Sequence, residues 1–215
     1  MVIARRNLMA GKALPYDAEV EWIESTDTQY IDTGINGDES TDAIELDFEL
    51  SRIVAQNRLF SCGEDTFPSF QGYINGSLKY GFRINQSWSG GYEDMTLNRT
   101  LWKCDYFNKE HIINGTVYSY TTTSKQRSAL TVKVPYKYGV NPPARLKLFG
   151  LKYFSNDKLK LNMFPVRFTN ENGASEGAMY NRLGVGGMNP DGTARNDGLF
   201  RNRGTGAFRI GPFKT

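Results

Sequence analysis

The sequence predicts an all-β protein, a two-sheet antiparallel sandwich, on the strength of three observations. Aromatic residues make up 13% of the 215 residues, and 12 Tyr and 13 Phe favour strands. The 22 glycines suit tight turns. Short segments that alternate apolar and polar residues recur along the chain, separated by Gly, Pro, Asn or Asp. About a dozen such strands and no long helix are expected, a spacing typical of sandwiches and barrels.

The chain is expected to begin with an extended N-terminal arm. Residues 1–18 are basic, with Arg5, Arg6 and Lys12, and they show no clean hydrophobic period. We therefore predict an arm over 1–18 and one sandwich domain over 19–215.

The first strand is expected at 29–35, where Ile31, Thr33 and Ile35 alternate with their neighbours after a polar turn, "ESTDT". First and last strands of such sandwiches commonly pair. The last apolar segment, "AFRIGP" at 207–212, is therefore predicted to lie beside it.

The strongest strand signal is residues 43–50, "AIELDFEL". Its even-numbered residues are apolar and its odd-numbered residues from Glu45 to Glu49 are acidic, which is the period of a half-buried strand. Further strands are expected in "LKYGFRI" (78–84), "LWKCDYF" (101–107), "HIINGTVYSY" (111–120), "ALTVKV" (129–134), "RLKLFGLKYF" (145–154) and "KLKLNMFPVRF" (158–168). Asn114 and Gly115 predict a hairpin turn, because both residues tolerate positive φ.

Composition limits the classes of partner. A net charge of +3 does not favour nucleic acid, and no apolar run approaches the roughly 20 residues of a membrane span. The N-terminal segment lacks the apolar run of a signal peptide, so we expect folding in a reducing cytoplasm. Cys62 and Cys104 are then expected to be buried free thiols.

Several separated segments resemble one family. "EWIESTDTQYIDTGI" (21–35), "DYFNKEHIINGT" (105–116) and the series "LFG", "FPVR", "MYNRL" and "LFRNRGTGAFRIGP" between 148 and 212 are similar to concanavalin A-like, laminin-G-type jelly-roll domains. Such domains occur in bacteriophage virion proteins and gut-bacterial surface proteins. The resemblance covers 19–214 and implies a concanavalin A-like jelly roll, a fold that hosts lectins, hydrolases and structural modules. The segment "GVGGMNPDGTARNDG" (184–198) is longer than the family's usual turn.

An enzymatic alternative comes from residues 45–49, "ELDFE". They are similar to the Glu-x-Asp-x-Glu signature of laminarinase-type glycoside hydrolases, which implies Glu45 as nucleophile, Asp47 as its orienting group and Glu49 as acid/base. Glutamates four positions apart on a strand have Cα atoms roughly 13 Å apart, whereas a retaining mechanism needs carboxyl groups about 5–5.5 Å apart. An ordinary amphipathic strand explains the same pattern.

Two further groups of residues are candidate binding sites, one for sugars and one for Ca²⁺. Trp88, Tyr92 and Tyr73 are predicted to lie in or near loops, where exposed rings stack on sugars. Asp191, Asn196 and Asp197 form an oxygen-rich segment that is a candidate Ca²⁺ site, although Arg195 within it opposes a cation. A single histidine, His111, excludes a multi-histidine metal site, and no cofactor is expected.

We therefore expect a non-enzymatic bacteriophage virion structural protein, in capsid decoration, a head fibre or the tail, made in the cytoplasm of the bacterial host. Arg5, Arg6 and Lys12 would dock it on neighbouring virion proteins, with a second basic cluster at Arg195, Arg201, Arg203 and Arg209. Copies are expected to form a homo-oligomer, and host surface glycans are a further ligand. The alternatives are a carbohydrate-binding, lectin-like module and the glycoside hydrolase.

Overall fold

The chain forms an all-β structure. The computed structural model describes residues 14–26, 28–55, 57–62, 71–74, 77–84, 87–121, 127–136 and 144–215. In these ranges there are seventeen strands and no helix, and all pairings between the named strands are antiparallel. Within the same ranges no helix is long and apolar enough to span a membrane.

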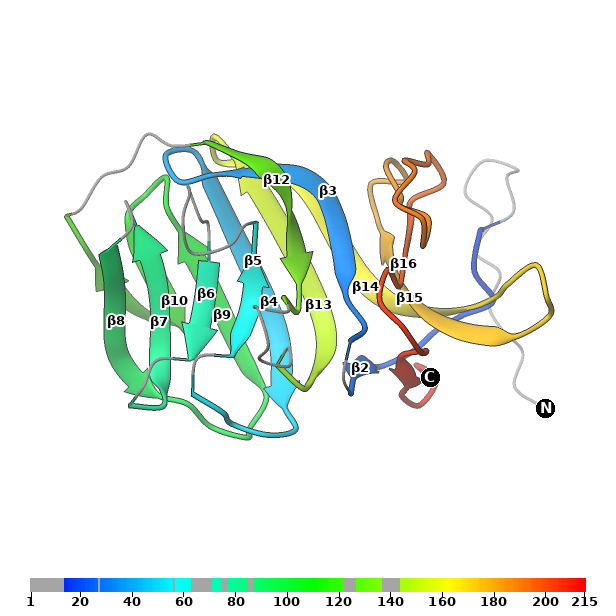
Figure 1. Cartoon of the computed structure of the whole chain (residues 1–215), viewed down its shortest axis with the longest axis horizontal. Helices are drawn as coiled ribbons and strands as arrows, with labels where there is room; N and C mark the ends of the chain where they lie inside the picture. Colours follow the sequence, from blue (N-terminus) through cyan, green and yellow to red (C-terminus); the bar gives the residue numbers. More distant parts are fainter. Residues whose placement is uncertain are drawn as a thin grey trace.

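Two sheets face each other (Figure 1). The larger sheet follows the order β11 (Thr116–Ser119), β10 (Glu110–Ile113), β9 (Thr100–Asp105), β4 (Asp42–Leu50), β13 (Leu146–Ser155), β14 (Lys158–Thr169), β15 (Ser175–Asn181) and β16 (Leu199–Arg201), joined by the short strands β1 (Ala18–Glu19), β2 (Ile23–Ser25) and β17 (Arg209–Ile210). The smaller sheet follows the order β3 (Ile31–Asp38), β12 (Arg127–Val134), β5 (Arg58–Ser61), β6 (Gln71–Ile74), β7 (Lys79–Ile84) and β8 (Ser87–Asp94).

The strand alternation of β4 is confirmed. Ile44, Leu46, Phe48 and Leu50 are all buried and face the smaller sheet, while Glu45, Asp47 and Glu49 are partly exposed on the opposite face. The hairpin between β10 and β11 is also confirmed, with Asn114 at φ 49° and Gly115 at φ 89°. Some ends of the predicted strands lie outside the observed ones. Tyr106 and Phe107 follow β9 in a turn, and Leu78 precedes β7 with φ 59° and is 45% exposed.

Trp102 lies at the centre of the core between the two sheets. It extends from β9 and is 1% exposed. Its ring centroid lies 5.8 Å from that of Phe60 on β5 and 5.1 Å from that of Tyr80 on β7. Gly72 on β6 provides the space, because a Cβ there would lie 2.7 Å from the Trp102 ring. One large aromatic side chain thus joins the two layers, and its burial contributes on the order of 3 kcal/mol.

β13 and β14 pair along only part of their length and then diverge. Their pairing runs from Ser155↔Lys158 to Leu151↔Met163. Beyond that point β2 takes the edge of β13, with Leu148 opposite Ile23, and β1 takes the edge of β14, with Val166 opposite Glu19. We call the gap between the diverging strands the fork. The N-terminal segment 18–25 therefore fills the fork and satisfies the backbone groups on both sides of it.

The C-terminal segment pairs with the other edge of 18–25. β17 pairs with β2, the amide of Glu21 donates to the carbonyl of Pro212 at 2.8 Å, and that of Lys214 donates to Glu19 at 3.2 Å. The two ends of the chain thus form one ribbon, residues 18–25 with 209–214, beside β13 and β14. We refer to it as the terminal ribbon.

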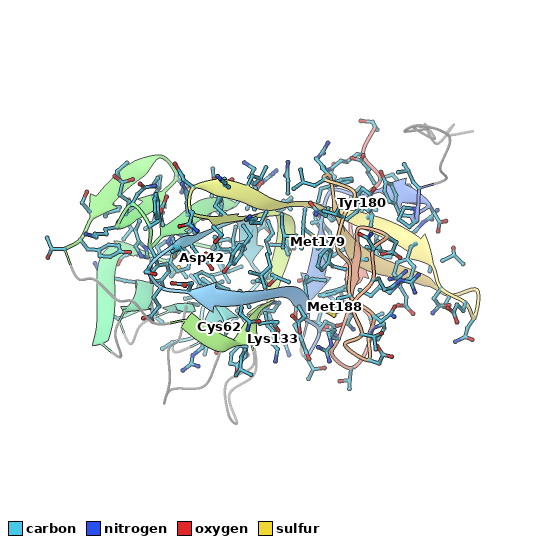
Figure 2. The ribbon with its side chains drawn as sticks, turned by 90° about the horizontal axis from the view of Figure 1, so that it is seen from above. Asp42, Cys62, Lys133, Met179, Tyr180 and Met188 are labelled. Carbon is cyan, nitrogen blue, oxygen red and sulfur yellow. The ribbon has the colours of Figure 1, made fainter. Side chains whose placement is uncertain are left out.

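The far part of the β14–β15 hairpin extends beyond the sandwich and is buried on both faces (Figure 1). One face carries Met179, which belongs to the main core together with Met188 of the loop 182–198. The other carries a second apolar cluster of Phe164, Val166, Phe168, Ala178 and Leu199, against which Tyr16 and Tyr180 pack. Figure 2 shows Met179, Tyr180 and Met188 gathered in this region, away from Asp42 and Cys62 in the sandwich.

Two boundaries differ from the sequence prediction. The strand expected at 29–35 begins at Ile31, and its partner is β12, not "AFRIGP", which pairs with β2 instead. Tyr16, Asp17 and Ala18, which were assigned to the arm, belong to the folded domain. The ring centroid of Tyr16 lies 4.9 Å from that of Tyr180, and the amide of Asp17 donates to Arg167 at 2.8 Å.

The core around Trp102 allows a direct test. Gly72→Ala places a methyl group against the rings of Phe60 and Trp102, and should lower the free energy of unfolding by about 2–3 kcal/mol. The matched control is Gly150→Ala on β13, where the nearest atoms lie at an ordinary 3.7 Å, with an expected change within about 0.5 kcal/mol. Urea unfolding followed by Trp fluorescence measures both; equal effects of the two substitutions would contradict this packing.

Candidate functional site

The outer face of the larger sheet carries the acidic residues that the sequence singled out. Glu45, Asp47 and Glu49 project from β4 on the side opposite its buried residues. The adjacent strands are β13 on one side and β9 on the other. This face is therefore the candidate site for the predicted hydrolase chemistry.

Each of the three carboxylates is bound to a cation from another segment. Lys152 Nζ lies 2.8 Å from Glu45 Oε1, and Lys147 Nζ lies 2.6 Å from Glu49 Oε1. Both lysines stand directly opposite their glutamates in the β13–β4 register. Arg99 donates to both oxygens of Asp47, at 2.8 and 2.7 Å, in the bidentate geometry that is strongest for this pair. Arg99 was not singled out from the sequence, since nothing local marks it as a partner of residue 47.

The charge pairing continues across the sheet. Arg209 on β17, Glu24 on β2, Lys147 on β13 and Glu49 on β4 occupy successive positions of one cross-strand row, with alternating signs. Arg209 lies 3.7 Å from Glu24 in this row. A further ion pair lies within β9, where Lys103 Nζ is 2.6 Å from Asp105 Oδ2. Opposite charges on neighbouring strands stabilise a sheet by roughly 0.2–1 kcal/mol per pair, so this face works as a structural charge ladder.

This geometry does not favour glycoside hydrolysis. The general acid of such an enzyme must hold a proton near neutral pH, and it does so in an apolar site away from cations. Glu45 and Glu49 are instead in direct contact with the ammonium groups of Lys152 and Lys147. The two lysines stand five residues apart on β13, so they hold the two glutamates at separate positions along the sheet.

Aromatic rings on the same face are covered by these cations. The Arg99 guanidinium lies 4.0 Å from the ring centroid of Phe149, Lys147 Nζ lies 5.2 Å from that of Trp22, and Lys103 Nζ lies 5.1 Å from that of Phe154. These distances are those of cation–π contacts. Each ring therefore has one face occupied from within the molecule.

The predicted sugar-binding residues lie in strands. Trp88 and Tyr92, predicted to flank a loop, are both within β8, and Tyr73 is within β6. The reason is the pairing of glycines: Gly90 of the segment "SGG" stands opposite Gly81 on β7, so these glycines continue a strand. The side chains of Trp88, Tyr92 and Tyr73 lie outside the described part of the structure, so their role in glycan binding remains a prediction.

The oxygen-rich loop at 189–198 is held by its own contacts. Asp191 Oδ1 accepts from the amide and the hydroxyl of Thr193, at 2.9 and 2.7 Å. Asn196 Oδ1 accepts from the amide of Gly186 at 3.3 Å. The three candidate ligands are thus engaged in turns and pairs. Across the ranges that the structure describes, no three His, Cys, Asp or Glu side chains are grouped as a metal site would require.

Asp197 organises the basic cluster of the C-terminal region. Its Oδ2 lies 2.9 Å from Arg195 Nε and 3.2 Å from Arg201 Nη2, and its Oδ1 accepts from the amide of Leu199. Burial alone would raise the pKa of Asp197, but the Leu199 amide and the two guanidinium groups lower it. Both arginines therefore stabilise the loop from within.

The remaining arginines of the cluster are also paired. Arg203 Nη1 lies 2.8 Å from Oδ2 of Asp32, a carboxylate that is only 2% exposed at the start of β3. Arg209 is the most exposed of the four, and its partner is Glu24. Sequence reasoning missed Asp32 as a partner because it lies 171 residues away along the chain. Of the docking candidates, Arg5, Arg6 and Lys12 lie outside the described residues.

A comparison with protein-family models finds no match for this chain, and a comparison with curated proteins likewise finds none.

His111, Trp102 and Cys104 form a buried polar contact inside the sandwich. Trp102 Nε1 donates to Nδ1 of His111 at 3.2 Å, and Cys104 Sγ lies 3.7 Å from the same nitrogen. His111 Nδ1 is thus an acceptor, which places the ring proton on Nε2. Burial raises the pKa of the Cys104 thiol well above its usual value. Cys62 and Cys104 are both buried free cysteines, as expected, and a buried neutral thiol is a poor nucleophile.

Acid should destabilise the protein through His111. Burial lowers the pKa of His111 to about 3, although nearby Asp105 opposes the shift. Because the unfolded pKa is near 6.5, the stability from the neutral ring is fully present above pH 6.5 and is lost as the pH falls toward 3. At pH 4.5 the loss is on the order of 3 kcal/mol. His111→Gln, compared with wild type by urea unfolding from pH 7.5 to 4.5, should lack this loss; parallel stability curves would contradict it.

Proposed function

We propose that this chain is a non-enzymatic structural protein of a bacteriophage virion, a concanavalin A-like jelly roll that attaches to neighbouring virion proteins. It serves in capsid decoration, in a head fibre or in the tail. It is made in the cytoplasm of the bacterial host, with no role for nucleic acid or a membrane. Copies self-associate, and host surface glycans are a further ligand. The antiparallel two-sheet architecture and the family resemblance of several ordered segments support this assignment.

One observation carries the non-enzymatic part of the proposal: the side chains that resemble catalytic groups are engaged in internal contacts. The carboxylates of Glu45, Asp47 and Glu49 pair with Lys152, Arg99 and Lys147. A hydrolase would need at least one of these oxygens directed at a substrate. A stable, self-neutralised sheet face suits a scaffold.

The arrangement of the chain ends supports attachment through one end of the molecule. The terminal ribbon brings residues 18–25 and 209–214 together, and the C-terminus lies at the end opposite β8 (Figure 1). Four arginines near this end are paired with Asp197, Asp32 and Glu24. Of the two basic clusters considered for docking, the unassigned one is Arg5, Arg6 and Lys12, which precede the ribbon in sequence.

Virion incorporation of an N-terminally shortened chain tests the proposal. The shortened chain starts after residue 13, because Tyr16 to Ala18 belong to the folded domain. In assembled particles it should be incorporated at least about tenfold less than the full chain, since the docking charges are lost. Quantitative mass spectrometry of purified particles gives the copy number.

Charge reversal separates docking from loss of chain length. Arg5→Glu with Arg6→Glu should reduce incorporation as the truncation does. The matched control is Lys158→Glu with Lys160→Glu, at two exposed positions of β14. Incorporation of the truncated chain at the level of the full chain would refute the role assigned to the N-terminal segment.

A further inference from the structure

The outer edge of β11 presents the backbone N–H and C=O groups of alternate residues. The amide of Tyr120 donates to the carbonyl of Lys109 at 3.0 Å, so Tyr120 and Lys109 form a hydrogen-bonded pair of the β10–β11 ladder. In an antiparallel ladder such pairs alternate with pairs whose backbone groups point away. Val117 and Ser119 occupy the alternate positions, opposite Ile112 and Glu110. Their N–H and C=O groups therefore point away from β10.

This edge has no strand beside it, because β11 is the last strand of the larger sheet in the part of the chain that the structure describes. Three other edge strands carry an isolated bridge or charged residues. Met188 bridges to Phe200 on β16, and Asn202 bridges to Ile31 on β3. β8, the last strand of the smaller sheet, ends in Glu93 and Asp94, whose charges oppose edge pairing.

The edge of β11 carries no charged residue and no proline. From Gly115 to Ser124 the sequence contains no charged residue and no proline. Val117 is 53% exposed, and Leu101 on the outer face of β9 is 45% exposed. Tyr118 does not block the edge, because its hydroxyl is hydrogen-bonded to Glu93 of the smaller sheet. An uncharged edge next to exposed apolar side chains favours pairing with another strand.

We propose that β11 pairs antiparallel with β11 of a second copy, which extends the larger sheet across a two-fold dimer. The register follows from the outward groups. With Tyr118 opposite Tyr118 of the second copy, Val117 stands opposite Ser119 of that copy, and Ser119 stands opposite Val117. Every outward N–H then meets an outward C=O, which gives four backbone hydrogen bonds. A second copy is the occupant because this edge is complementary to itself in that register.

The dimer is a weak one, because a four-residue edge buries less surface than a standard interface. A dissociation constant of about 10–100 µM is expected for the isolated protein. Many copies held on one particle would strengthen the contact through their effective concentration. This inference names the surface through which copies self-associate, and it rests on the proposed function only in that self-association. Its test uses purified protein, so a failure of virion docking would leave the inference untouched.

Sedimentation velocity of the full chain from about 1 to 300 µM tests the proposal. Wild type should shift from monomer to dimer across this range. Val117→Lys should weaken dimerisation at least about tenfold, since it brings two charges together at the edge. Ser119→Pro should do the same, because it removes an N–H that points away from β10 and leaves the intrachain ladder intact.

The control is Leu159→Lys, which adds the same charge at a position that is 39% exposed on β14, and it should dimerise as wild type does. Circular dichroism checks that each variant is folded, and Val117→Lys decides the question if Ser119→Pro is not. A wild type that stays monomeric at the highest concentration overturns the proposal. A dimer that survives both edge substitutions in folded protein overturns it equally.

Discussion

The fork between β13 and β14 is the constraint on which the rest of the structure depends. The two strands pair from Ser155↔Lys158 to Leu151↔Met163 and then separate. Each would present a row of unpaired N–H and C=O groups in the gap, which is costly in a packed structure. Residues 18–25 satisfy one strand through β2 and the other through β1. The C-terminal residues 209–214 then complete the terminal ribbon, so the two ends of the chain hold the far part of the hairpin to the sandwich.

Charge pairing accounts for the acidic residues of β4 and for the C-terminal basic cluster, the two charged groups that were identified in the sequence. On the larger sheet, Glu45, Asp47 and Glu49 alternate with lysine and arginine from other segments. In the C-terminal region, Asp197 and Asp32 bind the arginines of the basic cluster. A contact between opposite charges stabilises strand register and loop conformation modestly. On both surfaces the charged side chains are bound to one another.

Local patterns predicted the local structure. The alternation in residues 43–50 predicted both the buried face of β4 and the outward position of its acids. Asn114-Gly115 predicted its hairpin, because the turn needs positive φ at both positions. The pairing of strands that lie far apart in the sequence could not be predicted. Nothing local pairs β3 with β12, since strand order is decided by packing of the whole chain.

The candidate site shows the same division. The acids of β4 were identified and correctly placed on one face, but their cations come from β13 and from Arg99, up to 107 residues away. The glycines near Trp88 were interpreted as a loop because glycine usually weakens a strand, and the structure instead sets Gly90 opposite Gly81. Tyr16 was assigned to an arm because a tyrosine near a proline shows no period, while its partners Phe164 and Tyr180 lie at the other end of the chain.

Differential scanning calorimetry of the full chain, and of a chain that ends at Phe208, tests the role of the terminal ribbon most directly. The full chain should unfold in a single transition, because the ribbon joins the sandwich and the far part of the hairpin into one cooperative unit. Removal of residues 209–215 should lower the transition temperature by several degrees or split the transition in two. Two transitions in the full chain, or an unchanged trace after removal, would contradict the account.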